Sequence, residues 1–308
     1  MAKKPSKPIA KKPPSARSEA VRKFTFHFAA AMAFAAVLAV GFYFARREVA
    51  VKLAYSADPP NVVFRDRPAW MTDDVAESLT RSVRPMRGSS AFDSRVLADC
   101  AAVLNANPWV KKVNAVRRAY GAQPGDTIEI DCEFRAPMAL VRWQEYYWLI
   151  DADGYKLPEQ YTGEQAADLI LDNDRRPHLR IIEGVEHAPV ESGQKWPGAD
   201  LAAGLELTRL LFGQRYADEV VKIDIANFAG RVDAREAQLT LVTRYGSEVR
   251  WGRPISAKDA FVEVPPAKKL EAMQQIYAQY NRLDAGQPWI DIRFDQVTYP
   301  SASADTGR

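Results

Sequence analysis

FTFHFAAAMAFAAVLAVGFYFA, the stretch from Phe24 to Ala45, is a run of 22 residues without a formally charged side chain. At the ~1.5 Å rise per residue of an α-helix, this run is about 30 Å long, which matches the hydrocarbon core of a bilayer. The run therefore predicts one transmembrane helix over residues 24–45. It separates a short N-terminal tail from a much longer part that can hold two modest domains.

The residues before this run are strongly basic. Residues 1–23 carry eight Lys or Arg residues and a single acid, Glu19. Because basic flanks stay in the cytoplasm, we expect the N-terminus there and residues 48–308 on the far side of a cell inner (cytoplasmic) membrane, in the periplasm. The tail is rich in Lys, Pro and Ser, a composition that predicts disorder over residues 1–23.

A cleaved signal peptide is the alternative interpretation of the same residues. The apolar core of a signal peptide usually spans only ~7–15 residues, which is shorter than the run here. Ala39-Val40-Gly41 nevertheless has the small-x-small pattern of a cleavage site. The length of the run favours an uncleaved anchor.

The chain beyond the anchor is mildly acidic. Residues 48–308 carry 32 basic and 38 acidic residues, a net charge of −6, although the whole chain carries +3. Domains that bind nucleic acid are usually basic, so we expect no nucleic-acid partner. The cysteines and histidines beyond the anchor are scattered without metal-ligand spacing, and we therefore expect no metal and no other cofactor.

Two cysteines, Cys100 and Cys132, lie beyond the predicted anchor, where disulfides can persist. Cys100 lies on the apolar face of a predicted helix, and Cys132 lies on the inward face of a predicted strand. A helix packed on that sheet could bring the two sulfur atoms within bonding reach, but two buried free thiols are at least as compatible with the pattern.

Residues 61–136 follow a connector over residues 46–60 and show the order strand, helix, helix, strand, strand. Thr72 is the predicted N-cap of the first helix, and a turn is predicted over Gln123–Asp126. The clearest strand is Thr127–Phe134, in which apolar and acidic residues alternate. The five predicted elements are Asn61–Phe64, Thr72–Val83, Ser94–Asn105 (with Val96, Leu97, Cys100, Val103 and Leu104 buried), Val110–Ala119 and Thr127–Phe134.

Residues 137–299 are predicted to form a mostly antiparallel β domain with two or more helices, which makes the chain α+β as a whole. The predicted strands are Ala139–Trp143, Tyr146–Ile150, Tyr155–Leu157, Leu179–Ile182, Val220–Ala226, Gln238–Arg244, Glu248–Trp251 and Trp289–Tyr299. The predicted helices are Asp200–Phe212, capped by Asp200, and Pro265–Asn281, with Leu270, Met273, Tyr277 and Tyr280 on its core face. Residues 300–308 are a polar tail that we expect to be disordered.

The last predicted strand has the clearest pattern in this domain. Its apolar residues should pack on the core and its charged residues should lie on an open face. These two sets are Ile290, Ile292 and Phe294, and Asp291, Arg293 and Asp295. An edge strand of this kind can accept a partner strand through main-chain hydrogen bonds, although charges on an edge also guard against aggregation.

The order of elements from about Asn61 to Tyr299 resembles the cell-division protein family FtsQ/DivIB. The motifs that carry the resemblance are Asn107-Pro108-Trp109-Val110-Lys111-Lys112-Val113, Ile128 to Pro137 (IEIDCEFRAP), Leu149-Ile150-Asp151-Ala152-Asp153-Gly154, Val249-Arg250-Trp251-Gly252-Arg253 and Ile290-Asp291-Ile292-Arg293-Phe294. Three departures stand beside them: Arg65-Asp66-Arg67-Pro68 replaces the usual Gly-Asn, residues 159–178 are enlarged, and Phe294 replaces the usual Tyr.

The resemblance implies a POTRA-like domain over residues 61–136 and an FtsQ-like β domain over residues 137–299. Members of the family are not enzymes: the POTRA module serves recruitment to the division site, and the β domain holds FtsB/FtsL-type (DivIC-type) bitopic partners. The implied function is a non-enzymatic scaffold at the septum. The residues expected to contact such a partner are Arg253, Arg293, Phe294, Gln296 and Tyr299.

Two other classes of protein compete with this interpretation. Another POTRA-containing envelope protein, assisting assembly or transport, is expected to carry a barrel or transport domain after the module. An envelope hydrolase needs a nucleophile with a base, or a pair of carboxylates in a pocket. The sequence contains no Gly-x-Ser-x-Gly and no His-based motif, so we do not expect an enzyme.

Overall fold

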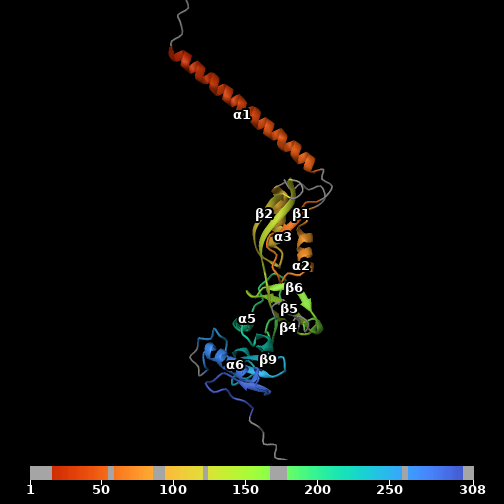
Figure 1. Ribbon diagram of the computed structural model, residues 1–308, viewed down its shortest axis with the longest axis vertical. Helices are drawn as coiled ribbons and strands as arrows, with labels where there is room; N and C mark the ends of the chain where they lie inside the picture. The colour runs from red at the N-terminus through yellow and green to blue at the C-terminus, as the bar shows by residue number, and fades with distance from the viewer. Residues whose placement is uncertain are drawn as a thin grey trace, which may run out of the picture.

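The computed structural model describes residues 16–54, 59–85, 94–120, 124–166, 179–258 and 263–300, without the side chains of residues 16–23, 50–54 and 120–126. These residues form one long N-terminal helix, a three-stranded sheet with two helices, and an eight-stranded sheet with helices of its own (Figure 1). The chain is therefore α+β, as the sequence predicted.

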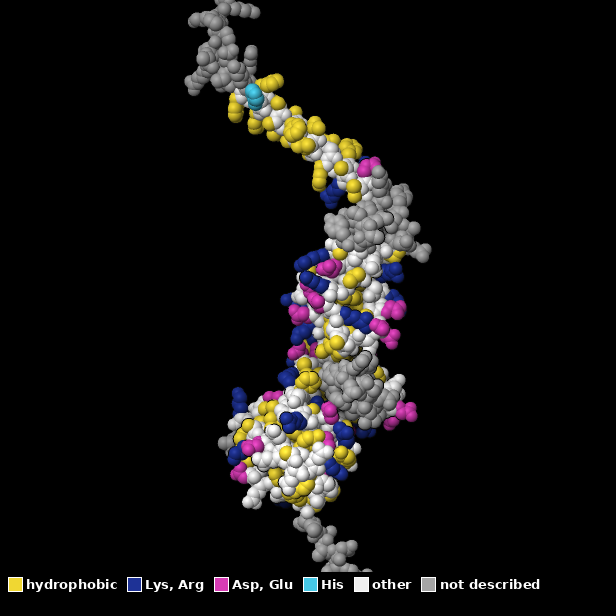
Figure 2. All heavy atoms as spheres, viewed as in Figure 1, with side chains coloured by type: hydrophobic (Ala, Val, Ile, Leu, Met, Phe, Trp, Pro, Cys, Tyr) yellow, Lys and Arg dark blue, Asp and Glu magenta, His cyan; other side chains and the backbone are white. Residues whose placement is uncertain are grey.

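Helix α1, Ala16–Ala54, contains the apolar segment Phe24–Val49, none of which is buried against the rest of the protein. Figure 1 shows the helix standing apart from the two sheets, and Figure 2 shows apolar side chains along its length. It is the one helix among the described residues that is long and apolar enough to cross a membrane.

The helix extends beyond both ends of the predicted span. The predicted disorder over residues 1–23 is wrong for residues 16–23, and the predicted connector over residues 46–60 is wrong as far as Ala54. Residues 46–54 contain no Gly or Pro, so nothing in the local chemistry ends the helix when the apolar run ends. Residues 1–15 lie outside the described residues.

The three-stranded sheet belongs to a compact unit that we call the N-terminal module. Its elements are β1 (Asn61–Phe64), α2 (Asp73–Val83), α3 (Ser94–Asn105), β2 (Val110–Tyr120) and β3 (Pro124–Phe134). The predicted order of strand, two helices and two strands is confirmed. Strand β3 lies in the centre, parallel to β1 and antiparallel to β2. Thr72 caps α2 as predicted, since its hydroxyl accepts the Val75 N–H at 3.4 Å.

The core of the module forms where β3 meets the helices. Ile128 and Ile130 of β3 are buried together with Leu79 of α2 and Leu104 of α3. Val103 is 43% exposed and was wrongly predicted to be buried, because α3 buries only the narrow face that contains Cys100 and Leu104.

The turn predicted over Gln123–Asp126 is wrong for Pro124 to Asp126, which belong to β3; Gln123 lies outside the described residues. The pairing of β3 with β2 continues to the pair Tyr120–Pro124, and this ladder keeps the backbone extended.

Both cysteines of the module are free thiols. The Cys100 sulfur donates to the Val83 carbonyl oxygen at 3.3 Å, which ties α3 to the end of α2. Cys132 is half-buried in β3, and burial raises the pKa of its thiol to about 11. Of the two alternatives that the sequence allowed, the structure contains the unbonded pair.

The second sheet has the strand order β11-β10-β9-β8-β7-β4-β5-β6. Its strands are β4 (Pro137–Trp143), β5 (Tyr146–Asp151), β6 (Lys156–Tyr161), β7 (Arg180–Glu183), β8 (Val220–Asp224), β9 (Leu239–Thr243), β10 (Glu248–Gly252) and β11 (Trp289–Asp291). Of the enlarged segment 159–178, residues 159–161 belong to β6 and residues 167–178 lie outside the described residues.

This sheet contains both parallel and antiparallel strand pairs. The prediction of a mostly antiparallel domain is right only by a narrow margin, since the antiparallel pairs outnumber the parallel pairs by one. Four neighbouring pairs are antiparallel, whereas β4–β7, β7–β8 and β10–β11 are parallel. Helix α5 (Ala199–Leu211) lies between β7 and β8 in the chain, and α6 (Pro266–Tyr280) lies between β10 and β11. Such helical crossovers return the chain in the same direction, which hairpins do not.

Two apolar clusters lie on the two faces of the β4–β5 region. Ala139 and Val141 of β4 belong to the cluster that packs under α5 and α6, whereas Leu140 between them belongs to the cluster of the module. Leu149 and Leu157 extend the module's cluster into β5 and β6. The alternation of β4 therefore joins the module to the second sheet.

Two details of the predicted helices are wrong. The N-cap of α5 is Gly198, not Asp200; the Asp200 carboxylate lies inside the first turn, where it accepts the Glu186 N–H at 2.8 Å and pairs with Arg231 at 3.2 Å. Tyr280 is 46% exposed rather than in the core, because α6 buries Met273 and Ile276 and ends at Tyr280.

Candidate protein-binding surface

The surface that the sequence singled out lies around the C-terminal edge of the eight-stranded sheet. Strand β11 is this edge and runs parallel to β10, with Glu248 beside Trp289 and Arg250 beside Asp291. The strand was predicted over Trp289–Tyr299, but it ends at Asp291. The edge is therefore three residues long.

Local hydrogen bonds end this strand. The Asp291 carboxylate accepts the backbone N–H of Arg293 at 3.0 Å, which is the Asx-turn geometry that competes with strand ladders. The chain then returns, and Thr298 exchanges two backbone hydrogen bonds with Asp291 at 2.9 and 3.1 Å. The outward backbone groups of Asp291, which a partner strand would need, are thus already used.

The prediction that the apolar residues of this segment are buried is right for Ile290 and Ile292. The prediction that its charged residues lie on an open face is wrong for Asp291 and Arg293. Ile290 and Ile292 are buried, as expected. Asp291 is only 4% exposed and pairs at 2.7 Å with Arg293, whose side chain is 12% exposed. Arg293 also donates to the Arg235 carbonyl oxygen at 2.9 Å, and its hydrogen bonds to Asp291 raise its pKa further. Arg293 therefore supports the fold.

Arg253 and Arg293 are joined through the segment that precedes α6. The backbone N–H of Arg253 donates to the Glu263 carboxylate at 3.0 Å, and the N–H of Val264 donates to the Arg293 carbonyl oxygen at 2.8 Å. Beneath them, the buried Lys269 ammonium donates to Glu263 at 2.7 Å and to the Trp251 carbonyl oxygen at 2.7 Å, while desolvation lowers its pKa.

Three exposed aromatic residues lie at the end of α6 and on the segment that follows β11, and we call them the aromatic surface: Tyr280, Phe294 and Tyr299, which are 46%, 42% and 38% exposed. The Arg293 guanidinium lies 5.3 Å from the centre of the Phe294 ring. Partial burial raises the pKa of Tyr299, and the Tyr280 hydroxyl near it raises that pKa further. Gln296 is exposed on the same returning segment.

The structure thus separates the predicted contact residues into two groups. Phe294, Gln296 and Tyr299 are exposed and Arg253 is partly exposed, whereas Arg293 is largely buried in an ion pair. The sequence did not indicate Tyr280 as a surface residue, because its spacing from Tyr277 is that of residues on the core face of a helix. Sequence reasoning also missed Glu263, a single acid before Pro265-Pro266 with no periodic neighbour.

Among the described residues, no group of three or more His, Cys, Asp or Glu side chains is placed to hold a metal ion. No model of a known protein family matches the chain, and a search among curated proteins finds no match.

Proposed function

We propose that this protein is a membrane-anchored, non-enzymatic scaffold of the cell-division machinery, of the FtsQ/DivIB type, which holds FtsB/FtsL-type or DivIC-type bitopic partners at the septum. The observation that carries the proposal is the arrangement of the module after a single apolar helix. Its order β1-α2-α3-β2-β3, with β3 central, is the arrangement expected of a POTRA-like domain.

The junction between the two sheets supports the same assignment. Strand β3 ends at Phe134 and β4 begins at Pro137, so the module leads into the second sheet almost without a linker. Arg135 in this junction pairs with the buried Asp151 at 2.7 Å. A scaffold needs such a junction, because a stiff connection keeps two binding domains at a defined distance from the membrane.

We place the partner site on the aromatic surface together with Gln296 and Arg253. Exposed aromatic residues are favoured at protein interfaces because they bury a large area at a low cost in conformational entropy. Since Thr298 already covers Asp291, the partner contacts these side chains rather than adding a strand along residues 291–298.

A pull-down of FtsB-like partners from membranes tests this site. The double variant Phe294→Ala/Tyr299→Ala should reduce partner recovery at least about fivefold, because it removes two exposed anchors. Phe212→Ala is the matched control, since Phe212 is a 61% exposed aromatic residue outside this surface. Equal recovery with all three proteins, each folded by circular dichroism, would remove the aromatic surface from the proposal.

The pull-down also separates the two candidate classes of scaffold. Recovery of division proteins supports the division scaffold. Recovery of outer-membrane assembly or transport components in their place would favour the alternative, another POTRA-containing envelope protein.

The topology is tested separately. We propose that α1 is an uncleaved anchor with its N-terminus in the cytoplasm, as the basic residues before Phe24 favour. A periplasmic reporter fused after Arg308 should be active and a cytoplasmic one inactive. Activity of the cytoplasmic reporter would overturn this topology.

A further inference from the structure

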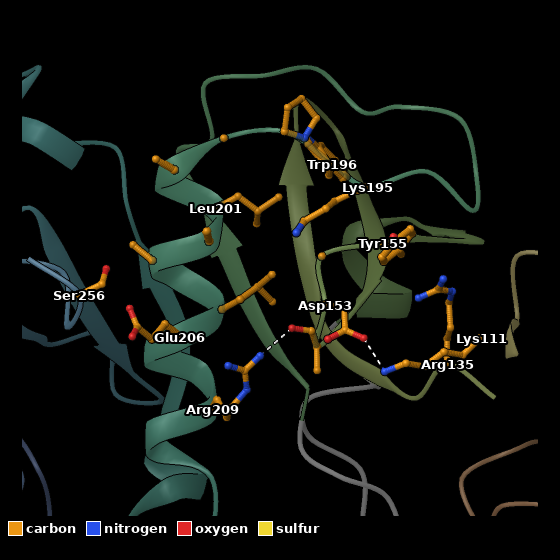
Figure 3. Close-up of a pocket in the computed structure, with 18 residues that line it drawn as sticks. Lys111, Arg135, Asp153, Tyr155, Lys195, Trp196, Leu201, Glu206, Arg209 and Ser256 are labelled. Carbon is orange, nitrogen blue, oxygen red and sulfur yellow. Dashed lines mark hydrogen bonds and ion pairs between the residues drawn. The ribbon is translucent and has the colours of Figure 1, made fainter. Parts of the chain in front are cut away.

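A cleft of about 1150 Å³ lies on the side of the molecule where the module meets the second sheet (Figure 3). Four separate parts of the chain line it: the module through Lys111 and Arg135, the turn after β5 through Asp153 and Tyr155, the segment from Lys195 to Arg209 that contains most of α5, and Ser256. It does not include the aromatic surface.

Two cations of this cleft have no carboxylate partner among the described residues. The Lys195 side chain is exposed and points across the cleft toward α5 in Figure 3. Arg209 projects from α5 and donates to the Ala152 carbonyl oxygen at 2.7 Å, a neutral acceptor. Both can pair with a carboxylate that enters from solvent.

The other two cations are paired, but they add to the positive potential. Lys111 binds Asp153 at 2.6 Å, and Arg135 lies 3.7 Å from the centre of the Tyr155 ring while it pairs with Asp151. The hydrogen bond from Lys111 lowers the pKa of Asp153, and the charges of Arg135 and Arg209 lower it further.

The remaining acid of the lining does not cancel this charge. In Figure 3, Glu206 projects from the opposite side of α5, toward Ser256 and away from Asp153. The cleft therefore concentrates positive charge on a part of the chain, residues 48–308, whose net charge is −6. A concave basic site on an acidic chain attracts anionic groups more strongly than an average patch of this surface.

The floor of the cleft is apolar and consists of small groups. Exposed Pro197, Ala199 and Ala202 lie over the buried Leu201 and Leu205. Drug-sized ligands are usually enclosed in pockets of ~300–1,000 Å³, whereas this cleft is open and larger. Its size and mixed lining suit a length of polypeptide.

We propose that this cleft binds an acidic segment of a partner protein. Carboxylates of the segment pair with Lys195 and Arg209, and its small apolar side chains lie on Ala202 and on the Tyr155 ring. This site is independent of the proposed function, because it uses none of the residues of the aromatic surface.

The test measures binding of defined peptides to the full chain in nanodiscs of zwitterionic phosphatidylcholine. The probe is a fluorescein-labelled peptide in which Glu alternates with Ala and Val; two matched peptides carry Gln or Lys in place of Glu. The Glu peptide should bind at least about threefold more tightly than the Gln peptide, since each exposed ion pair adds roughly a factor of two to five.

Charge reversal locates the site. The variant Lys195→Glu/Arg209→Glu should abolish the preference for the Glu peptide and create one for the Lys peptide. The control Arg84→Glu/Arg215→Glu reverses two exposed cations that do not line the cleft, and it should keep the preference for Glu. An unchanged preference in the cleft variant, or an equal loss in the control, would overturn the inference.

Discussion

The central strand β3 and the edge strand β11 differ in the number of neighbours that hold them. Strand β3 is hydrogen-bonded to β1 on one side and to β2 on the other, whereas β11 pairs with β10 alone. Both stretches alternate apolar and charged residues. Yet β3 remains extended over 11 residues and β11 over 3.

The difference shows that an alternation of apolar and charged residues does not by itself determine the length of a strand. From Thr127 to Ile130, β3 has a ladder on each side, and its ladder with β2 continues to Pro124 and to Phe134. At β11 one side has no strand, and the Asp291 carboxylate binds the Arg293 N–H while Thr298 returns to the outer side. At Asp291, where the strand pairs with β10 alone, the local side-chain hydrogen bond prevails over extension.

The largest expected effect comes from removing a buried isoleucine. It tests whether burial contributes equally to the free energy of unfolding in β3 and in the region of β11. Ile130 of β3 and Ile292 after β11 are each 1% exposed. Ile130→Ala and Ile292→Ala should each lower the free energy of unfolding by about 3 kcal/mol, because each leaves a cavity in a core. Urea unfolding followed by tryptophan fluorescence measures both.

Val63→Ala is the control for these two variants, since Val63 is 43% exposed in β1 and should cost less than about 1 kcal/mol. A cost for Ile292→Ala as small as that of the control would show that the edge region is loosely packed, contrary to this comparison.

The next effect concerns the turn that ends β11. Asp291→Ala should lower the free energy of unfolding by about 2 kcal/mol, because it leaves the mostly buried Arg293 guanidinium and a backbone N–H without their acceptor. Asp295→Ala, which removes an exposed ion pair with Lys268, should change it by less than about 0.5 kcal/mol. Equal costs would contradict the role of Asp291.

A pH titration examines the loop that leads into β11. Asp284 is buried and receives hydrogen bonds from Arg282, Ser247 and the Gly286 N–H. Desolvation raises the pKa of Asp284, but the bonds from Arg282 and Ser247 outweigh it and hold that pKa below its ordinary value of 3.8.

The stabilisation from Asp284 is therefore present above pH 3.8 and is lost as the pH falls through its lower folded pKa. Thermal melting between neutral pH and about pH 2 should show a shallower acid decline for Asp284→Asn than for the wild type. A decline of the same slope in both proteins would exclude Asp284 as a contributor.

The smallest effect concerns the thiols of the module. Alkylation of the unreduced protein should label both Cys100 and Cys132 after unfolding, since neither is bonded. In the folded protein near neutral pH, labelling of Cys132 should be slow, because its pKa of about 11 leaves little thiolate. Mass spectrometry that finds no labelled thiol after unfolding would demonstrate a disulfide instead.

The local features of this chain follow from its residues alone. The apolar run from Phe24, the Thr72 cap and the alternation of Ile128 and Ile130 gave the helix α1, the start of α2 and the inward face of β3. These features depend on residues within a few positions of one another, so they can be predicted from the sequence.

Only the tertiary structure determines which distant residues meet. Lys111, Asp153 and Arg209 line one cleft because β4 joins the module to the second sheet and α5 crosses back over it. The length of β11 depends likewise on a missing neighbour and on the return of Thr298. Such contacts join residues far apart in the chain, where no periodicity or local hydrogen bond connects them.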